Sequence, residues 1–170
     1  MIKTLSRMIR TGILTEEAPP APQEDLEIGG LQENIRKILG RALCIRHVDA
    51  GSCNGCELEI QALNNPYYNI EGIGIKFVAS PRHADLLLVT GPVSVNMEEA
   101  LKRTFDAVPD PKIVIAVGDC GACGGIFARS YASRGAVADV IPVDHSVKGC
   151  PPAPKAILQA ILQTIQSTTT

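Results

Sequence analysis

Hydrophobic and polar residues follow two different spacings along the chain, and the two alternate from residue 42 onward. Short apolar runs have the length of strands, whereas other segments repeat apolar residues every three and four positions, as one face of a helix does. The short runs predict strands over 42–48, 73–79, 84–90, 111–117 and 139–143. The helical spacing predicts helices over 31–42, 57–63, 97–108 and 154–165.

This alternation of strands and helices predicts an α/β fold with a mostly parallel sheet. The continuous apolar runs at 84–90 and 111–117 are typical of strands buried on both faces. Pro142 has no backbone N–H, so the strand over 139–143 is expected near an edge of the sheet. In the helix over 97–108, the residues expected to face the core are Ala100, Leu101, Phe105 and Val108.

The segment before residue 30 differs from the rest of the chain. Residues 1–14 have the spacing of a short amphipathic helix, which we interpret as a docking segment for a partner; a frayed terminus is the alternative. Residues 15–29 hold three prolines and five acidic residues and are predicted to form an extended linker. The folded domain is therefore expected over residues 30–170.

Composition narrows the class of protein. A formal net charge of −2 and an aromatic content of 4% argue against a nucleic-acid binder, which usually carries a basic patch or stacking aromatic residues. The first residues lack the apolar core of a secretion signal, and no apolar run approaches the roughly 20 residues of a membrane helix. The chain is expected to be cytosolic or peripheral on a membrane complex. In a reducing compartment, clustered cysteines indicate metal binding or catalysis rather than structural disulfides.

Five of the six cysteines lie in loops that follow predicted strands. Cys53 and Cys56 follow the first strand, Cys120 and Cys123 follow the fourth in a glycine-rich turn, and Cys150 follows the fifth. Because ligands of open α/β sheets bind outside the carboxyl ends of the strands, these loops can meet at one point. The remaining cysteine, at position 44, lies within the first strand and is expected to be a buried, inert thiol.

The spacing of the cysteines leaves three kinds of site open. A zinc ribbon would pair Cys53 and Cys56 with Cys120 and Cys123, but 63 residues separate the two pairs, against roughly 15–20 in such ribbons. A thioredoxin-like redox pair would use the first two cysteines alone. An iron–sulfur cluster held by four thiolates from three loops would also employ Cys150.

Several ordered motifs follow the linker: GSCNGCELEIQAL, PRHADLLLVTGPV, PDPKIVIAVGDCGACGG, IPVD and GCPPAPKAIL. Over about residues 40–165, the chain resembles the small electron-transfer subunit of membrane-bound, energy-converting nickel–iron hydrogenases of the formate hydrogenlyase type. The same family includes the 20 kDa quinone-proximal subunit of respiratory complex I. The resemblance implies a flavodoxin-like fold with a single 4Fe–4S cluster at the carboxyl-edge loops.

The resemblance also implies the ligands, which match Cys53, Cys56, Cys120 and Cys150. Cys123 stands where the family often has a small or polar residue, so it is a spare thiol or a substitute ligand. In the hydrogenase branch two residues separate the first two ligands, as they do here, whereas in complex I the two are adjacent. This spacing favours the hydrogenase branch.

The function implied by the resemblance is electron relay. The cluster would pass electrons between ferredoxin-like iron–sulfur subunits and the nickel–iron site of a hydrogenase-type large subunit, in a complex with membrane subunits on the cytoplasmic side of the cell membrane. The chain itself would have no independent active site. The alternatives are a complex I-like quinone- or sulfur-reducing complex and a zinc-stabilised scaffold.

Charged residues near the cysteines are candidates for secondary roles. Glu57 follows the second cysteine and is a candidate proton relay, although a carboxylate at a helix start is also explained by the helix dipole. Arg46, His47, Arg82 and His83 are candidate cations for the site, and His47 can titrate near neutral pH.

Overall fold

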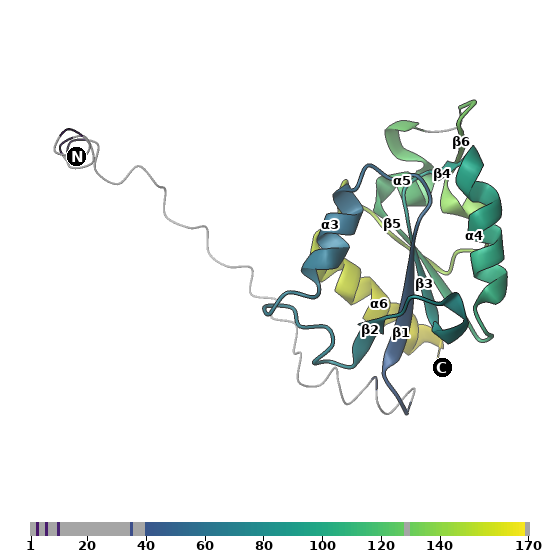
Figure 1. Cartoon of the computed structure of the whole chain (residues 1–170), viewed down its shortest axis with the longest axis horizontal. Coiled ribbons are helices and arrows are strands. Elements are labelled where there is room, and N and C mark those ends of the chain that lie inside the picture. Colours follow the sequence, from purple (N-terminus) through teal and green to yellow (C-terminus); the bar gives the residue numbers. More distant parts are fainter. Residues whose placement is uncertain are drawn as a thin grey trace.

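The computed structural model describes residues 40–127 and 130–168, together with Lys3, Ser6, Arg10 and Ile35. Most of the predicted docking segment over 1–14 and all of the predicted linker over 15–29 lie outside the described residues. Lys3, Ser6 and Arg10 are helical and exposed, and Ile35 is helical and buried. The account below concerns the body of the protein from residue 40 onward (Figure 1).

A five-stranded parallel sheet forms the centre of this body, with strand order β2-β1-β3-β5-β7. Its strands are β1 (Leu43–Asp49), β2 (Ile75–Phe77), β3 (Leu86–Thr90), β5 (Ile113–Val117) and β7 (His145–Val147). All five residues of β3 are buried, as its continuous apolar run predicts for the middle strand of a sheet covered on both faces. The predicted α/β fold with a parallel sheet is confirmed.

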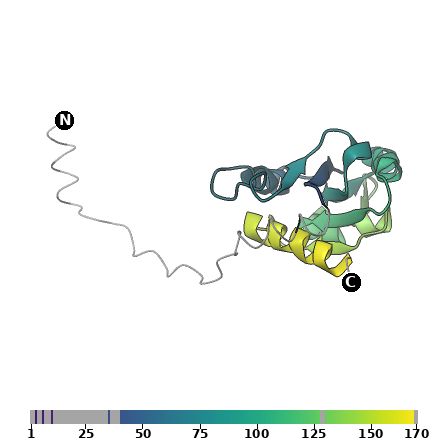
Figure 2. The ribbon, with the colours of Figure 1, turned by 90° about the horizontal axis from the view of Figure 1, so that it is seen from below.

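Helices cover both faces of the sheet. Helices α3 (Gly55–Ala62) and α6 (Pro154–Thr168) pack on one face and α4 (Val95–Ala107) packs on the other (Figures 1 and 2). Alternate side chains of β3 point to opposite faces of the sheet. Leu86 and Leu88 belong to the core between the sheet and α6, and Leu87 and Val89 belong to the core between the sheet and α4. Of the residues expected to face inward from α4, Ala100 is exposed instead.

The chain between β5 and β7 departs most from the sequence-based expectation. The predicted strand over 139–143 is absent, and the 3₁₀ turn η3 (Val137–Asp139) occupies its beginning. The Asp139 carboxylate accepts the Ala136 N–H at 3.0 Å and closes this turn, and Pro142 has no N–H to offer a neighbouring strand. The strand at the β5 edge of the sheet is instead β7, which begins at His145. The residue before it, Asp144, accepts the Val114 N–H of β5 through its carboxylate at 2.7 Å.

A smaller layer lies beside the carboxyl edge of the sheet. Its antiparallel strands are β4 (Val93–Ser94) and β6 (Ser133–Gly135), and the short helix α5 (Gly118–Cys123) and the 3₁₀ turn η2 (Gly125–Phe127) follow β5. A third 3₁₀ turn, η1 (Pro81–His83), precedes β3. Within the part of the chain that the structure describes, no helix is both long and apolar enough to cross a membrane.

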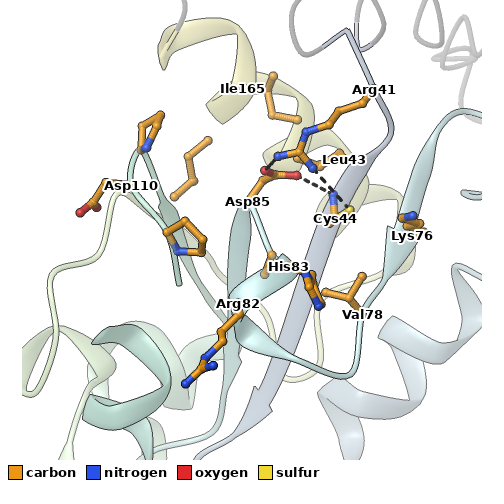
Figure 3. A pocket seen from close by; sticks show the side chains of 14 residues that line it. Arg41, Leu43, Cys44, Lys76, Val78, Arg82, His83, Asp85, Asp110 and Ile165 are labelled. Atoms are coloured by element: carbon orange, nitrogen blue, oxygen red, sulfur yellow. Dashed lines mark hydrogen bonds and ion pairs between the residues drawn. The ribbon is translucent and has the colours of Figure 1, made fainter. Parts of the chain in front are cut away.

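The amino end of the sheet has a cavity of about 740 Å³ (Figure 3). The carboxylate of Asp85, at the start of β3, pairs with the Arg41 guanidinium and accepts the Cys44 N–H at 3.0 Å, which ties β1 to β3. Arg82 and His83 line the same cavity. Cys44 is therefore buried at the end of the sheet opposite the other cysteines, as expected for a structural thiol.

Candidate metal centre

The loops that follow β1, β5 and β7 meet at the carboxyl edge of the sheet and enclose a cavity of about 120 Å³. Cys53 and Cys56 enter it from the first loop, Cys120 from α5, and Cys150 from the last loop. The rest of the lining is small or polar: Ser52, Gly55, Gly91, Asp119, Gly149 and Pro151. All four cysteines implied by the resemblance thus reach one cavity from three distant parts of the sequence.

The first loop is shaped by one carboxylate. Asp49 ends β1, and its Oδ1 accepts the N–H groups of Gly51 and Ser52, both at 2.8 Å. Asn54 has a φ of 72°, which reverses the chain so that α3 begins at Gly55. As a result Cys53 is exposed on the loop, while Cys56 is buried in the first turn of α3.

The second and third loops are joined by a pair of hydrogen bonds. The Asp119 N–H donates to the Gly149 carbonyl, and the Gly149 N–H donates to the Asp119 carboxylate, each at 2.9 Å. This pair fixes α5, which carries Cys120, against the loop that carries Cys150. Asp119 was not predicted as a site residue. Its position next to Cys120 could have indicated it, but its hydrogen-bond partner Gly149 lies 30 residues away in the sequence.

Two glycines make room for the sulfur atoms. A Cβ added at Gly118, where φ is +85°, would lie 2.6 Å from the Cys56 Sγ. A Cβ added at Gly125 would lie 2.9 Å from the Cys120 Sγ. Both distances are shorter than real Cβ contacts, so a side chain at either position would displace a sulfur, and the positive φ of both residues also favours glycine.

The thiols influence one another electrostatically. Burial raises the pKa of Cys56 to about 12, and the negative charges of Glu57, Cys120, Cys53 and Cys150 contribute in that order. Burial also raises the pKa of Cys120, with Cys150 and Cys53 as the next causes. Four thiolates this close repel one another, so they can ionise together only around a positively charged group such as a metal core.

Cys123 lies outside the cavity. Its side chain is exposed on the last turn of α5, and its Sγ donates to the Asp119 carbonyl at 3.2 Å. Cys123 is not among the residues that line the cavity, whereas Cys120, one turn earlier on the same helix, is. The structure therefore brings Cys120 rather than Cys123 to the other three cysteines.

Four thiols are also a donor set for a single zinc ion, so the kind of metal is distinguished by the positions of the thiols rather than by their chemistry. Among the described residues, no three His, Cys, Asp or Glu side chains lie close enough together to share one ion. A zinc ribbon would also need Cys123 in the cavity. The four thiols line one common cavity, and cysteine thiolates are the ligands that iron–sulfur clusters use.

Comparison with known proteins identifies the family. Residues 53–164 match the family described as "NADH ubiquinone oxidoreductase, 20 Kd subunit". The chain belongs to this family. The matched region begins at Cys53 and contains all four cysteines of the cavity. Members of the 20 kDa subunit family are parts of oxidoreductase complexes, as the sequence motifs implied.

Individual members of the family are similar over most of the described body. The "Probable membrane-bound hydrogenase subunit mbhJ" of Pyrococcus furiosus is 47% identical over 130 residues, which cover 76% of this chain and 78% of that protein. "Formate hydrogenlyase subunit 7" of Escherichia coli is 44% identical over 140 residues, which cover 82% of this chain and 55% of that protein. A structure of the archaeal membrane-bound sulfane sulfur reductase superposes with a TM-score of 0.65 at 31% identity, covering 83% of this chain and 75% of that one.

A buried polar group lies next to the cysteines of this family member. Glu57 is 7% exposed, and both of its carboxylate oxygens are buried without a hydrogen-bond partner. The His47 Nε2 is 3.8 Å from the Glu57 Oε1 and 3.1 Å from the Thr90 Oγ1. The sequence indicated Glu57 and His47 as two separate candidates for a role at the site. It did not indicate Thr90, because the contact of Thr90 with His47 depends on the register of β1 with β3.

The other candidate cations differ in position. Arg46 lies beside His47 on β1 and lines a separate cavity of about 250 Å³. Arg82 and His83 lie at the amino end of the sheet (Figure 3), so the expectation that they supply positive charge to the cysteines is wrong.

Proposed function

We propose that this chain is an electron-transfer subunit that carries one 4Fe–4S cluster bound by Cys53, Cys56, Cys120 and Cys150. It relays electrons between partner iron–sulfur subunits and the nickel–iron site of a hydrogenase-type large subunit. The observation that carries the proposal is the convergence of these four cysteines, from three loops, on one glycine-lined cavity. When bound, such a cluster takes up and returns one electron at a time.

The four cysteines differ in exposure, and this suits a relay. Cys53 and Cys150 are exposed, whereas Cys56 is buried and Cys120 is half-buried. The site therefore faces the protein surface on one side, where a second redox centre can come close. On the other side, the backbone of Gly118 lies against the Cys56 sulfur and that of Gly125 against the Cys120 sulfur.

Exposed apolar residues next to the site support a partner at this edge. Ile126 is 89% exposed and Phe127 is 48% exposed, directly after α5, and Leu58 on α3 is 57% exposed. Large exposed apolar side chains that cluster beside a functional site are typical of protein–protein interfaces. We assign this edge to the large subunit.

The names of the relatives support the proposed location and the remaining partners. The hydrogenase relative is named as membrane-bound, so we propose a peripheral position on the cytoplasmic side of the cell membrane, with membrane subunits and a ferredoxin-like iron–sulfur subunit as partners. Residues 1–14 are proposed to dock on a partner, residues 15–29 to link, and residues 30–170 to form the cluster domain.

A second candidate is a complex I-like oxidoreductase that reduces sulfur or quinone. It is favoured by the similarity in structure to the sulfane sulfur reductase. The two-residue gap between Cys53 and Cys56 supports the hydrogenase assignment over a quinone-reducing complex I. The 47% identity to a hydrogenase-named relative supports it over the sulfur-reducing complex, whose matched structure is 31% identical.

The test is to purify the native complex through a tag on this chain. We expect roughly four irons per copy of this chain and a reduced-state EPR signal from its cluster, nickel in the large subunit, and hydrogen evolution from a reduced viologen. Zinc without iron in this chain would contradict the proposal that it binds an iron–sulfur cluster. Iron without nickel, with sulfide produced from sulfur, would move the assignment to the second candidate.

A further inference from the structure

The sheet has an incomplete edge next to β1. The outer strand on this side is β2 (Figure 1), and it pairs with residues 43–45 of β1 only. The Val78 N–H, directly after β2, donates to the Ile45 carbonyl at 2.8 Å and ends this contact. In the described part of the chain, no strand pairs with the same side of residues 46–49, although β1 continues to Asp49.

A cavity of about 250 Å³ lies where β2 ends and β1 continues. Its lining comes from the end of β2, from β1, and from the second half of α3 and the residue two positions after it: Phe77, Val78, Arg46, His47, Ile60, Gln61 and Asn64. Neighbouring residues of a strand point to opposite faces of the sheet. Because Arg46 and His47 both line the cavity, it reaches around the edge of β1.

The incomplete edge has the properties of a strand-binding site. A strand edge presents backbone N–H and carbonyl groups at regular intervals, and an extended peptide that lies beside it can pair with them. Residues 46–49 offer room for about four residues of extended chain, which is roughly 13 Å. The exposed amide side chains of Gln61 and Asn64 add donors and acceptors along one wall, and Phe77 adds an apolar contact.

The charge at this edge favours an acidic occupant. Arg46 is half-buried, and its Nε is buried without a hydrogen-bond partner. Among the residues that the structure describes, no carboxylate forms an ion pair with Arg46; the nearby Asp49 carboxylate instead accepts the N–H groups of Gly51 and Ser52. Buried polar groups are normally satisfied, and a guanidinium pairs most favourably with a carboxylate.

The cavity is continuous with the edge assigned above to a partner. Leu58 is 57% exposed, and Gln61, which lines the cavity, is also exposed. The two residues are three apart on α3 and therefore lie on the same side of this helix. A partner that covers Leu58 is thus in place to extend a segment to the edge of β1.

We propose that an extended segment of a partner subunit adds to the edge of β1 beside residues 46–49 and places a carboxylate against Arg46. This inference rests on the part of the proposed function that makes the chain a subunit of a complex. The segment continues the sheet where β2 stops, and its side chains enter the cavity between β1 and α3.

The test is photo-cross-linking in the native complex, purified through a tag on this chain. A benzophenone amino acid replaces Gln61 on the wall of the cavity. We expect a cross-link to one segment of another subunit, with an Asp or Glu within it, located by peptide mass spectrometry. The same replacement at Arg103, on the exposed side of α4 and so on the opposite face of the sheet, is the control and should give no link to that segment.

Charge exchange tests the predicted ion pair. Arg46→Glu should lower the yield of this cross-link by roughly tenfold or more, because it sets two like charges against each other. Exchange of the identified Asp or Glu of the partner for Lys should restore the yield. Arg103→Glu makes the same change in charge on the opposite face and should leave the yield unchanged. Should Arg46→Glu fail to assemble, Asn64→Asp adds a negative charge to the wall without altering β1 and should also lower the yield.

Four results would overturn the inference: a cross-link to a second copy of this chain, a cross-link to the chain's own residues 1–39, no cross-link, or a yield that the added negative charge leaves unchanged. Iron and nickel are measured in the same samples. A cross-link without iron would contradict the proposed cluster and leave the strand-binding edge standing. Iron and nickel without the cross-link would overturn this inference alone, so the two failures are distinguishable.

Discussion

Asp119 and Gly149 hold each other through two hydrogen bonds of 2.9 Å, one through the Asp119 backbone and one through its side chain. The pair joins two loops that approach the cysteine cavity from different strands, β5 and β7. Because the loops share no backbone ladder beyond the strand ends, this contact fixes the position of Cys120 relative to Cys150.

Asp119→Ala is expected to loosen this junction. It removes the acceptor for the Gly149 N–H, and a hydrogen bond to a charged group contributes about 1.5–3 kcal/mol. We expect lower iron content per chain and a lower denaturation midpoint. Asp119→Asn retains an oxygen acceptor and should recover most of both. Equal iron content in Asp119→Ala and wild type would contradict the role of this pair.

Gly118→Ala is expected to abolish cluster binding. Its Cβ would lie 2.6 Å from the Cys56 Sγ, so the added methyl group must displace this sulfur or the backbone that holds it. Gly40→Ala is a matched control, because Gly40 also has a positive φ, +64°, but nothing lies within 4 Å of its added Cβ. Both variants carry the backbone strain of about 1–2 kcal/mol. Iron analysis should separate them, with loss in Gly118→Ala alone.

Serine substitutions at the two cysteines of α5 should have opposite outcomes. Cys120→Ser removes a thiolate that lines the cavity, and the EPR signal of the cluster should be lost or strongly altered. Cys123→Ser changes an exposed side chain that donates to the Asp119 carbonyl, which a hydroxyl can also do. A cluster that survives Cys120→Ser but not Cys123→Ser would make Cys123 the ligand.

The metal-free chain should show graded thiol reactivity. Alkylating reagents attack the thiolate, and Cys56 is both buried and held protonated by a pKa of about 12. With iodoacetamide at pH 8, the exposed Cys53, Cys123 and Cys150 should be modified first and Cys56 last. Peptide mass spectrometry over time measures the order. Rapid modification of Cys56 in the folded chain would show that the first turn of α3 forms only with the cofactor.

His47 should make the metal-free chain sensitive to mild acid. Its pKa in the folded protein is below 6.5, chiefly through burial, so the unfolded chain binds a proton first as the pH falls. Stability is therefore complete above about pH 6.5 and decreases as the pH falls from there towards the lower folded pKa, by about 1.4 kcal/mol for each pKa unit between the states. Urea denaturation at pH 7.5 and pH 5.5 measures the difference, and His47→Gln should reduce it.

Much of the fold could be predicted because the sheet is buried on both faces. The runs that became β3 and β5 are continuous and apolar, which leaves few other structures open to them. The strand next to β5 at the edge of the sheet was harder to predict. The apolar run over 139–143 has the composition of a strand, but Pro142 and the turn closed by Asp139 prevent it from pairing. The more polar segment His145–Val147 forms β7 instead. Ala100 is exposed because alanine satisfies a helical spacing on either face.

The positions of the cysteines could be predicted from the sequence, but the contacts between side chains at the site could not. Cysteine positions after strands indicate where the thiols gather, because the topology of a parallel sheet brings those loops together. Contacts between side chains depend on register and on helix phase, which the sequence does not display. Two such contacts could not be predicted from the sequence. One is the position of Cys123 outside the cavity, and the other is the approach of His47 to Glu57 and Thr90.

The three loops of the cavity follow the order of synthesis, and this has a consequence for assembly. Cys53 and Cys56 are made first, Cys120 later, and Cys150 only after β7, the last strand of the sheet. A nascent chain halted before β7 would contain three of the four cysteines that line the cavity and would lack Cys150. On the proposed function, the cluster can be inserted only after translation has passed Cys150, which makes insertion a post-translational step.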